Sequence, residues 1–170
     1  MTIAIVGIDP GASGTFAFLD EQGNLVDVHD MPVDLVRVGK SDKRVISPAR
    51  VVALLEIAPK GTQVMMERLI AMPAFNKETG RRDKTLGAAS IGSFFRGGGV
   101  IEGACAALRM PLTLVPPAKW KAAVSCPANK DAARQRAAQR FPSCATAFAR
   151  KKDDGRAEAA LIALYGYLHP

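Results

Sequence analysis

An apolar, β-branched run at residues 2–8 ends abruptly at Asp9, and this feature constrains the fold more than any other. The run has the length of one buried strand, and the turn sequence Asp9-Pro10-Gly11 stops it. Two more short apolar segments follow tight turns, at residues 15–19 and 25–29. Three strands joined in this way predict an antiparallel meander, with Asp9 at the carboxyl end of its first strand.

The rest of the chain alternates between helix and strand patterns. Ser47 and Pro48 are a favourable helix start, and the apolar spacing continues that helix to about residue 59. Strand patterns occupy residues 63–66 and 111–115, and further helices are predicted at 86–108, 130–140 and 155–167. We expect residues 32–45 to be a basic connecting loop. The triplet Gly97-Gly98-Gly99 predicts a break in its helix, or alternatively close approach to a sister helix or to DNA.

This βββ-α-β-α-β-α-α order predicts an α/β fold. Its mixed five-stranded sheet would consist of three antiparallel strands with parallel additions, flanked by helices. We expect one domain over residues 1–170, because no linker is visible and the length suits a single core.

Positive charge is concentrated in one part of the chain. The net charge is +7, whereas residues 77–150 alone hold 13 Lys and Arg against 4 Asp and Glu, an excess of +9. Such a local surplus favours a polyanionic partner through counterion release. Three widely spaced cysteines fit no disulfide framework, and no uncharged apolar stretch reaches about 18 residues. We therefore expect no membrane span and a cytoplasmic location.

Two strand-terminal acids and an acid pair on the last helix form a candidate catalytic site. Asp9 and Glu67 each follow a predicted strand, at the sheet edge where ligands gather in α/β folds. Asp154 and Glu158 are four residues apart and share a helix face, with Asp153 competing for the first position. Carboxylate oxygens suit Mg²⁺, and two such ions can activate water and stabilise the leaving oxygen of a phosphodiester. The four acids are therefore candidate metal ligands.

Three short blocks, taken in order, resemble the RuvC family of Holliday junction resolvases, and its phage-type members most. The blocks are Gly7-Ile8-Asp9-Pro10-Gly11, Met65-Met66-Glu67 and Lys152-Asp153-Asp154-Gly155-Arg156-Ala157-Glu158-Ala159. Their order and spacing match along nearly the whole chain. The resemblance implies an RNase H-like fold.

The resemblance also implies a homodimer that cuts four-way DNA junctions with two Mg²⁺ or Mn²⁺ ions in each active site. Asp9 would bridge the ions, Glu67 would hold one, and Asp154 and Glu158 would complete the set. Lys121 falls where the family carries a residue that binds the scissile backbone, and the helix at residues 87–108 where it dimerises. The expected reaction is in-line attack of water on phosphorus, leaving 5′-phosphate and 3′-hydroxyl ends.

Further basic residues are candidate DNA contacts. The short basic segment around Trp120, the basic helix and the loop after Glu67 all carry them, although some of these side chains could instead cover the core or be solvated. The candidates are Lys119, Lys121, Lys130, Arg134, Arg81, Arg82 and Lys84.

The sequence departs from the family at two places. The family's closing acids, or a His and an acid, stand three residues apart, but position 155 here is Gly, so the pair becomes Asp154 and Glu158. The family's aromatic wedge after the strand-terminal Glu is replaced by Ile70, with Phe75 as the nearest aromatic. These departures leave sequence preference and junction opening unassigned.

Three other functions are alternatives. The segment at residues 7–15 also resembles the phosphate loop of actin-like ATPases and sugar kinases, but 170 residues leave no room for their second domain. A non-catalytic DNA-binding module of the same fold is a second alternative, although four acids facing DNA would repel phosphate without metal. A nuclease for flaps, forks or other branched DNA stays open.

Overall fold

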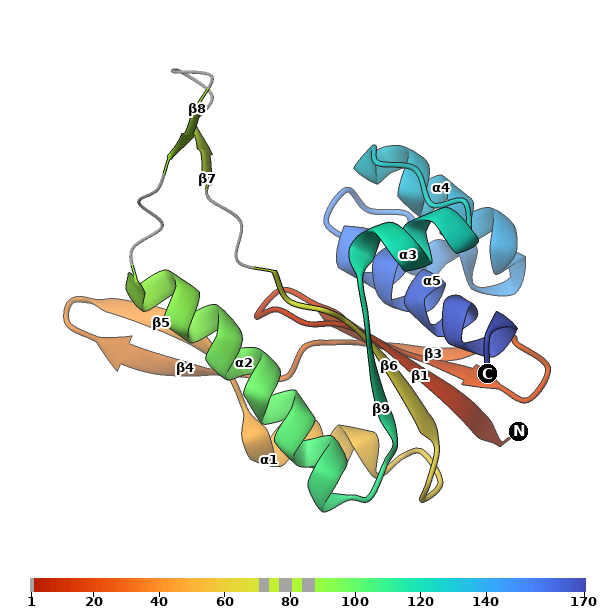
Figure 1. Ribbon diagram of the computed structural model, residues 1–170, viewed down its shortest axis with the longest axis horizontal. Helices are drawn as coiled ribbons and strands as arrows, with labels where there is room; N and C mark the ends of the chain where they lie inside the picture. The colour runs from red at the N-terminus through yellow and green to blue at the C-terminus, as the bar shows by residue number, and fades with distance from the viewer. Residues whose placement is uncertain (1, 71–73, 77–80, 84–87) are drawn as a thin grey trace.

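The computed structural model describes residues 2–70, 74–76, 81–83 and 88–170, with side chains described for 2–70 and 90–170. A five-stranded sheet crosses the centre of the molecule (Figure 1). Its strands, in the order in which they lie side by side, are β3 (Leu25–Asp30), β2 (Thr15–Asp20), β1 (Ile3–Asp9), β6 (Gln63–Glu67) and β9 (Leu112–Val115).

The strand directions confirm the predicted fold class. Strand β2 pairs antiparallel with both β1 and β3, whereas β6 pairs parallel with β1, and β9 pairs parallel with β6. An α/β sheet with three antiparallel strands and two parallel additions results. The carboxyl ends of β1, β6 and β9 therefore meet at one edge of the sheet.

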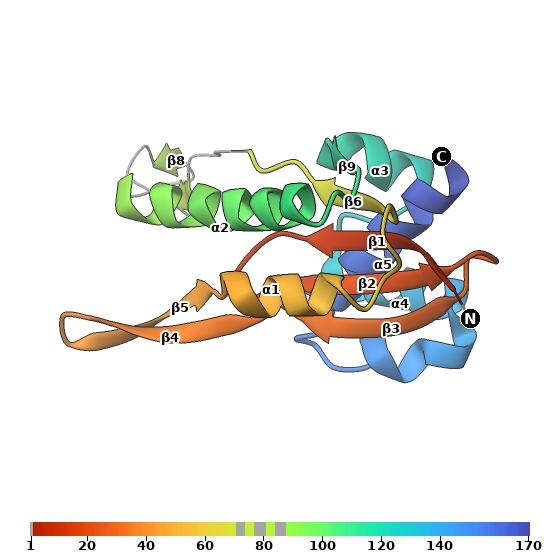
Figure 2. The same ribbon diagram turned by 90° about the horizontal axis from the view of Figure 1, so that it is seen from below.

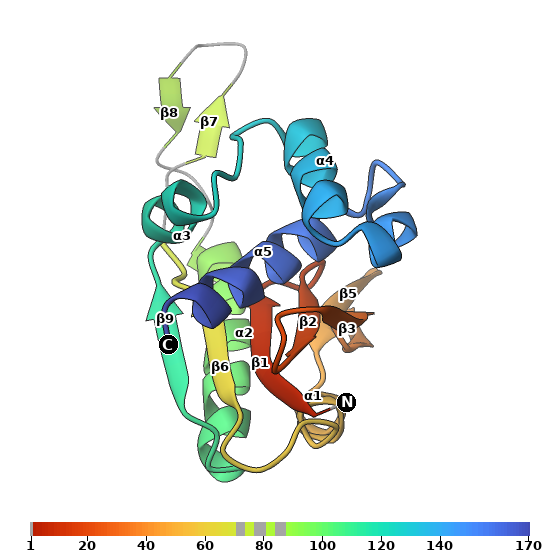
Figure 3. The same ribbon diagram turned by 90° about the vertical axis from the view of Figure 1, so that its right-hand side faces the viewer.

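Helices cover both faces of the sheet (Figure 2). Helices α1 (Pro48–Leu55) and α2 (Ala88–Ala107) lie on one face, where Val51 and Ile101 join the buried side chains Val6 and Ile8. Helix α5 (Asp154–Leu168) lies on the other face (Figure 3). The short helix α3 (Pro117–Ala123), helix α4 (Lys130–Arg140) and the 3-10 helix η1 (Pro142–Phe148) pack around α5 on that face.

Small residues let α5 cross β1 at close range. A methyl group built on Gly7 would lie 2.3 Å from the backbone oxygen of Ala159 and 2.4 Å from the backbone nitrogen of Ala163. Only a residue without a side chain allows helix and strand to approach so closely. The close crossing places the first turn of α5 beside the carboxyl end of β1.

Two sequence predictions about local structure were wrong. Residues 32–45 are not a loop but form most of a hairpin, β4 (Val33–Val38) and β5 (Ser41–Ile46), which extends beyond the central sheet (Figure 1). The glycine triplet at 97–99 does not break α2, because Gly97 packs against Ile46 and Gly98 against Leu69. Tertiary packing at these glycines compensates for their low helix propensity.

The segment after Glu67 contains a second short hairpin. Its described strands are β7 (Ala74–Asn76) and β8 (Arg81–Asp83), which pair antiparallel. Within the described parts of the chain, no helix has the length and apolar character needed to cross a membrane.

Candidate active site

The two strand-terminal acids lie side by side at the same sheet edge. In the parallel pairing of β1 with β6, Ile8 lies opposite Met66, so Asp9 and Glu67 each stand one residue beyond a matched pair. Both side chains are partly buried. The loop after Asp9 turns tightly, because the amide of Gly14 donates a hydrogen bond of 2.9 Å to the carbonyl oxygen of Gly11.

Helix α5 brings the other two acids to Asp9. A methyl group built on Gly155 would lie 3.0 Å from Oδ2 of Asp9, so the helix backbone itself borders that carboxylate. Asp154 is the residue before Gly155, and Glu158 lies one helical turn after Asp154. The structure thus brings together all four acids predicted from the sequence, and it places Gly155 of α5 beside Asp9.

The electrostatics of Asp9 reflect this arrangement. Burial and the negative charges of Glu158, Glu67 and Asp154, in that order of importance, raise the pKa of Asp9 to about 7. Burial also raises the pKa of Glu67 above its ordinary value, with a further contribution from the charge of Glu158. A buried carboxylate next to like charges is stabilised by protonation or by a bound cation.

Three side chains from α3 and α4 contact the acids. The indole Nε1 of Trp120 donates a hydrogen bond of 2.8 Å to Oε2 of Glu67. The ammonium of Lys121 lies 2.9 Å from Oε1 of Glu158. In the same way, the ammonium of Lys130 pairs with Oδ2 of Asp154.

These contacts change the pKa values of the groups involved. Burial by itself would lower the pKa of Lys121, but the hydrogen bond to Glu158 and the charges of Glu158 and Glu67 raise it above its ordinary value. Burial would raise the pKa of Asp154, yet the bond to Lys130 holds it below its ordinary value. Lys121 and Lys130 are therefore charged, and Lys130 stabilises the ionised form of Asp154.

The donor set fits a hard divalent cation in its chemistry. Asp9, Glu67, Asp154 and Glu158 offer only carboxylate oxygens, which Mg²⁺ and Mn²⁺ prefer. Among the residues that the structure describes, no three His, Cys, Asp or Glu side chains are spaced as a preformed metal cage. Ammonium groups instead contact Glu158 and Asp154.

Asp153 has a different role from its neighbour Asp154. Its side chain is 2% exposed and accepts hydrogen bonds from the backbone amide, Nε and Nη2 of Arg150. Burial would raise the pKa of Asp153, but these bonds hold it below its ordinary value. The guanidinium of Arg156, 3.8 Å away, also pairs bidentately with Asp30 and so anchors the start of α5 to β3.

The predicted DNA contacts are arranged less uniformly. Lys119 is exposed on α3. Arg134 on α4 is partly tied down, since it pairs with Asp131 at 2.9 Å and donates a hydrogen bond of 3.3 Å to the carbonyl oxygen of Lys151. Arg81 and Arg82 lie in β8, but their side chains, like the whole of Lys84, fall outside the described residues.

Two features of the site were missed by sequence reasoning. Trp120 was considered only together with Lys119 and Lys121, as a DNA contact or as a residue that covers the core at a helix start, whereas it is fully buried and donates a hydrogen bond to Oε2 of Glu67. The sequence signal for a site role of Trp120 was its position between two lysines, in a segment that starts with prolines. The proximity of Gly155 to Asp9 depends on the crossing of α5 over β1, for which the local sequence carries no signal.

The overall structure is similar to that of a Holliday junction resolvase. A structure described as T. thermophilus RuvC in complex with Holliday junction substrate superposes with a TM-score of 0.56 at 17% identity, covering 99% of this chain and 97% of that chain. This chain has the RuvC fold. A second structure, of Thermus thermophilus RuvC, has a TM-score of 0.47 at 18% identity and covers 95% of this chain and 91% of that chain.

The match to the RuvC fold confirms the resemblance expected from the short sequence blocks. It covers nearly the entire length of both chains, so the fold is shared from the first strand to the last helix. No protein-family model and no curated protein matches the sequence.

Proposed function

We propose that this protein is a structure-selective endodeoxyribonuclease that cuts four-way and other branched DNA with the help of divalent metal ions. The observation that carries the proposal is the convergence of Asp9, Glu67, Asp154 and Glu158 at one sheet edge of a RuvC fold. The T. thermophilus RuvC that shares this fold was solved with a Holliday junction substrate. A DNA substrate also agrees with the excess positive charge of residues 77–150.

In this proposal the four acids hold two ions, Mg²⁺ or Mn²⁺, in each active site. The ions would supply Lewis acidity at the scissile phosphate and lower the pKa of the attacking water. Asp9 lies among the other three acids and would contact both ions. The hydrogen bond from Trp120 holds Oε2 of Glu67 in place, so Trp120 is a positioning residue for this proposed ligand.

The cationic side chains act on the substrate. Lys121 keeps its proton at the active site because Glu158 and Glu67 raise its pKa, so it carries a positive charge that can bind the scissile phosphate. Lys130 and Lys119 would contact the neighbouring backbone from the same face of the sheet. Hydrolysis by in-line attack of water leaves a 5′-phosphate and a 3′-hydroxyl.

The proposed enzyme is a homodimer formed through α2. Gly92, Gly99 and Gly103 lie on one side of this helix, and a methyl group built on any of them would meet no atom of the described residues within 4 Å. Phe95 borders the same side and is 41% exposed. An open helix face with a large exposed aromatic side chain is typical of a protein interface.

The test is to incubate the protein and Mg²⁺ with labelled four-way, flap and linear duplex DNA of matched sequence. We expect paired symmetric nicks in four-way DNA and little cutting of linear duplex. The Asp9→Asn variant should lose cleavage by at least about 1,000-fold, because several kcal/mol of transition-state stabilisation is lost, and should still bind the junction. Cleavage that is unchanged in this variant would refute the assignment of the active site.

A further inference from the structure

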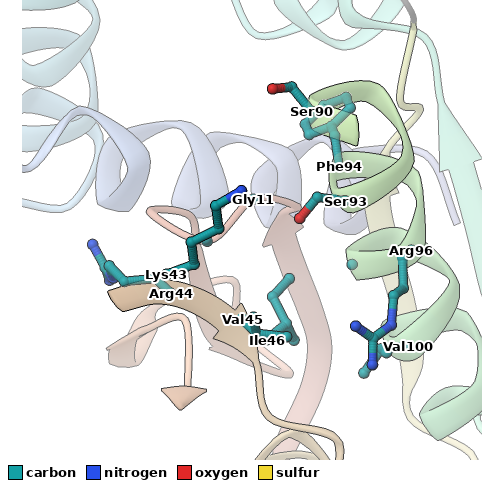
Figure 4. Close-up of a pocket in the computed structure, with 12 residues that line it drawn as sticks. Gly11, Lys43, Arg44, Val45, Ile46, Ser90, Ser93, Phe94, Arg96 and Val100 are labelled. Carbon is teal, nitrogen blue, oxygen red and sulfur yellow. The ribbon is translucent and has the colours of Figure 1, made fainter. Parts of the chain in front are cut away.

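A basic hollow lies on the side of the active site away from α5. It has a volume of about 400 Å³ and lies between strand β5, helix α2 and the loop after β1. Figure 4 shows Lys43 and Arg44 on β5 at one side of the hollow, and Ser93, Phe94 and Arg96 on α2 at the other. None of these residues is among the DNA contacts considered so far.

The side chains that line the hollow carry a net positive charge. Lys43, Arg44 and Arg96 are exposed, and none of them has a carboxylate within ion-pair distance among the described residues. Arg44 donates a weak hydrogen bond of 3.4 Å to the hydroxyl of Ser13.

The acids on the same hairpin are engaged elsewhere. Asp42 pairs with Arg37 at 3.2 Å, and Asp34 lies 3.9 Å from Arg50 on α1. Lys43, Arg44 and Arg96 therefore line the hollow without a compensating carboxylate among the described residues, and Lys43 reaches from β5 toward Gly11 (Figure 4). Such a surface favours a partner that carries several negative charges in a row.

The location of the hollow links it to the catalytic acids. Gly11 and Ala12 line its wall, and they belong to the loop that leaves β1 directly after Asp9. Lys121 and Lys130 approach the same acids from α3 and α4, on the opposite face of the sheet. The acidic sheet edge is thus flanked by positive charge on both sides.

We propose that the hollow between β5 and α2 binds the phosphate backbone of a DNA arm that runs on from the scissile phosphate. The inference rests on the proposed nuclease function and extends it to the β4–β5 hairpin. A DNA backbone suits both features of the site, because it spans the positive flanks and brings one phosphate to the acids between them. The ring of Phe94, which is 42% exposed, adds an apolar wall for a deoxyribose. The serine hydroxyls supply uncharged donors to phosphate oxygens.

The test compares two double variants of the hairpin that remove the same charge. Lys43→Gln with Arg44→Gln removes two charges from the hollow. Arg37→Gln with Lys40→Gln removes two charges near the hairpin tip, outside the residues that line the hollow. Binding to labelled four-way DNA is measured without divalent metal, so that no cutting occurs, at several salt concentrations. Thermal unfolding of both variants verifies that the fold is intact.

We expect the first double variant to bind at least about tenfold more weakly and the control less than about twofold more weakly. Loss of two phosphate contacts should also reduce the slope of log affinity against log salt by about 2. The single variant Arg96→Gln, on α2, should weaken binding in the same direction. Should the hairpin be destabilised by its substitutions, this variant on a different element tests the hollow independently.

The outcomes separate this inference from the proposed function. If the wild-type protein cuts four-way DNA but the hollow variants bind like the control, the hollow does not bind DNA and the nuclease function stands. If the wild type binds DNA without cutting it, the nuclease function fails and the binding data alone decide the inference. If the wild type binds no DNA, both are overturned.

Discussion

At the scale of single residues, Asp9 combines burial with three neighbouring negative charges. The pKa of about 7 means that, without metal, a large fraction of this carboxyl group is protonated near neutral pH. A divalent cation would reverse this state, because its charge favours the ionised carboxylate. The same group thus links metal binding, proton release and the stability of the fold.

This linkage predicts how the stability of the metal-free protein depends on pH. The folded pKa of Asp9 is raised from 3.8 to about 7, so the folded state binds more protons than the unfolded state between these values. The contribution of Asp9 to stability is therefore present below about pH 4 and is lost as the pH rises to about 7. As the pH rises over this range, the free energy of unfolding of Asp9→Asn should increase relative to that of the wild type, by at most roughly 4 kcal/mol.

Chemical denaturation of both proteins at pH 4, 5.5 and 7.5 with EDTA measures the difference. Comparing the two proteins cancels the opposite slopes from Asp153 and Asp154, whose pKa values are lowered. Adding Mg²⁺ at pH 7.5 should stabilise the wild type and not the variant. A stability difference that does not change with pH would contradict the electrostatic description of Asp9.

Glu158 and Asp153 lie near one another on the chain but should respond differently to loss of charge. Glu158→Gln removes a proposed metal ligand and should reduce cleavage more than about 100-fold with little change in stability. Asp153→Asn disrupts a buried network with Arg150 and should cost about 1–3 kcal/mol of stability. Its cleavage rate, measured well below the unfolding temperature, should stay within about threefold of wild type.

Paired measurements of unfolding and of single-turnover cleavage distinguish the two residues. Equal losses of cleavage in both variants, or a larger loss in Asp153→Asn, would show that the metal ligand has been assigned to the wrong acid. Asp154→Asn belongs in the same series, because Asp154 pairs with Lys130 and tests whether that ion pair matters for cutting.

At the scale of secondary-structure elements, the crossing of α5 over β1 determines where the closing acids lie. Gly7→Ala would place a methyl group 2.3 Å from a backbone oxygen of α5, so the helix has to move away from the strand. We expect a stability loss of about 1–3 kcal/mol or more from this overpacking. Cleavage should fall as well, because Asp154 and Glu158 move with the helix.

Gly11→Ala is the matched control for this variant. Among the residues with described positions, the same methyl group built at Gly11 would meet only the backbone nitrogen of Gly14, at 3.9 Å, which is an ordinary contact. Thermal unfolding of the control should be near wild type. If Gly7→Ala unfolds at the same temperature as the control, the close crossing of α5 does not limit the fold.

Most elements could be predicted from the sequence because burial leaves a periodic pattern. The five sheet strands and helices α1, α4 and α5 all carry such patterns, and the acids at the strand ends followed from them. The β4–β5 hairpin carries no such pattern, since it stands away from the core and Leu35 is 72% exposed. An exposed strand needs no alternation of polar and apolar residues, so a basic loop was the natural interpretation.

The site was predictable in its residues but not in its contacts. The order and spacing of the four acids identified them, because the carboxyl ends of neighbouring parallel strands must meet. The acids are contacted by Trp120 and by two lysines of basic segments, Lys121 and Lys130. The pairing of these lysines with Glu158 and Asp154 depends on how α3 and α4 pack against α5. Such contacts arise between elements that are distant in sequence and have no local signature.

At the scale of the whole molecule, the two faces of the sheet differ in what lies beside the active site. Helices α3, α4 and α5 surround the acids on one face, whereas α2 presents an open side on the other. A symmetric dimer through α2 would give the assembly two active sites related by a twofold axis. Two symmetric sites match a four-way junction, in which two equivalent strands must be cut.

The substitution Gly103→Glu tests this assembly. In a twofold interface both subunits carry the added carboxylate. The two added side chains therefore lie in the same interface, where their bulk and their like charges oppose association. We expect sedimentation velocity to show monomer for this variant where the wild type shows dimer. Because no atom in the described part of the chain lies within 4 Å of a methyl group built on Gly103, the fold of each subunit should be unaffected.

Gln22→Glu, at an exposed turn between β2 and β3, is the control for added negative charge and should leave the dimer intact. On a four-way substrate, the monomeric variant should nick single strands and lose the coupling of paired nicks, while its acids are unchanged. Dimerisation that persists in Gly103→Glu would exclude this side of α2 as the interface. Paired nicking by a protein shown to be monomeric would remove the need for a symmetric assembly altogether.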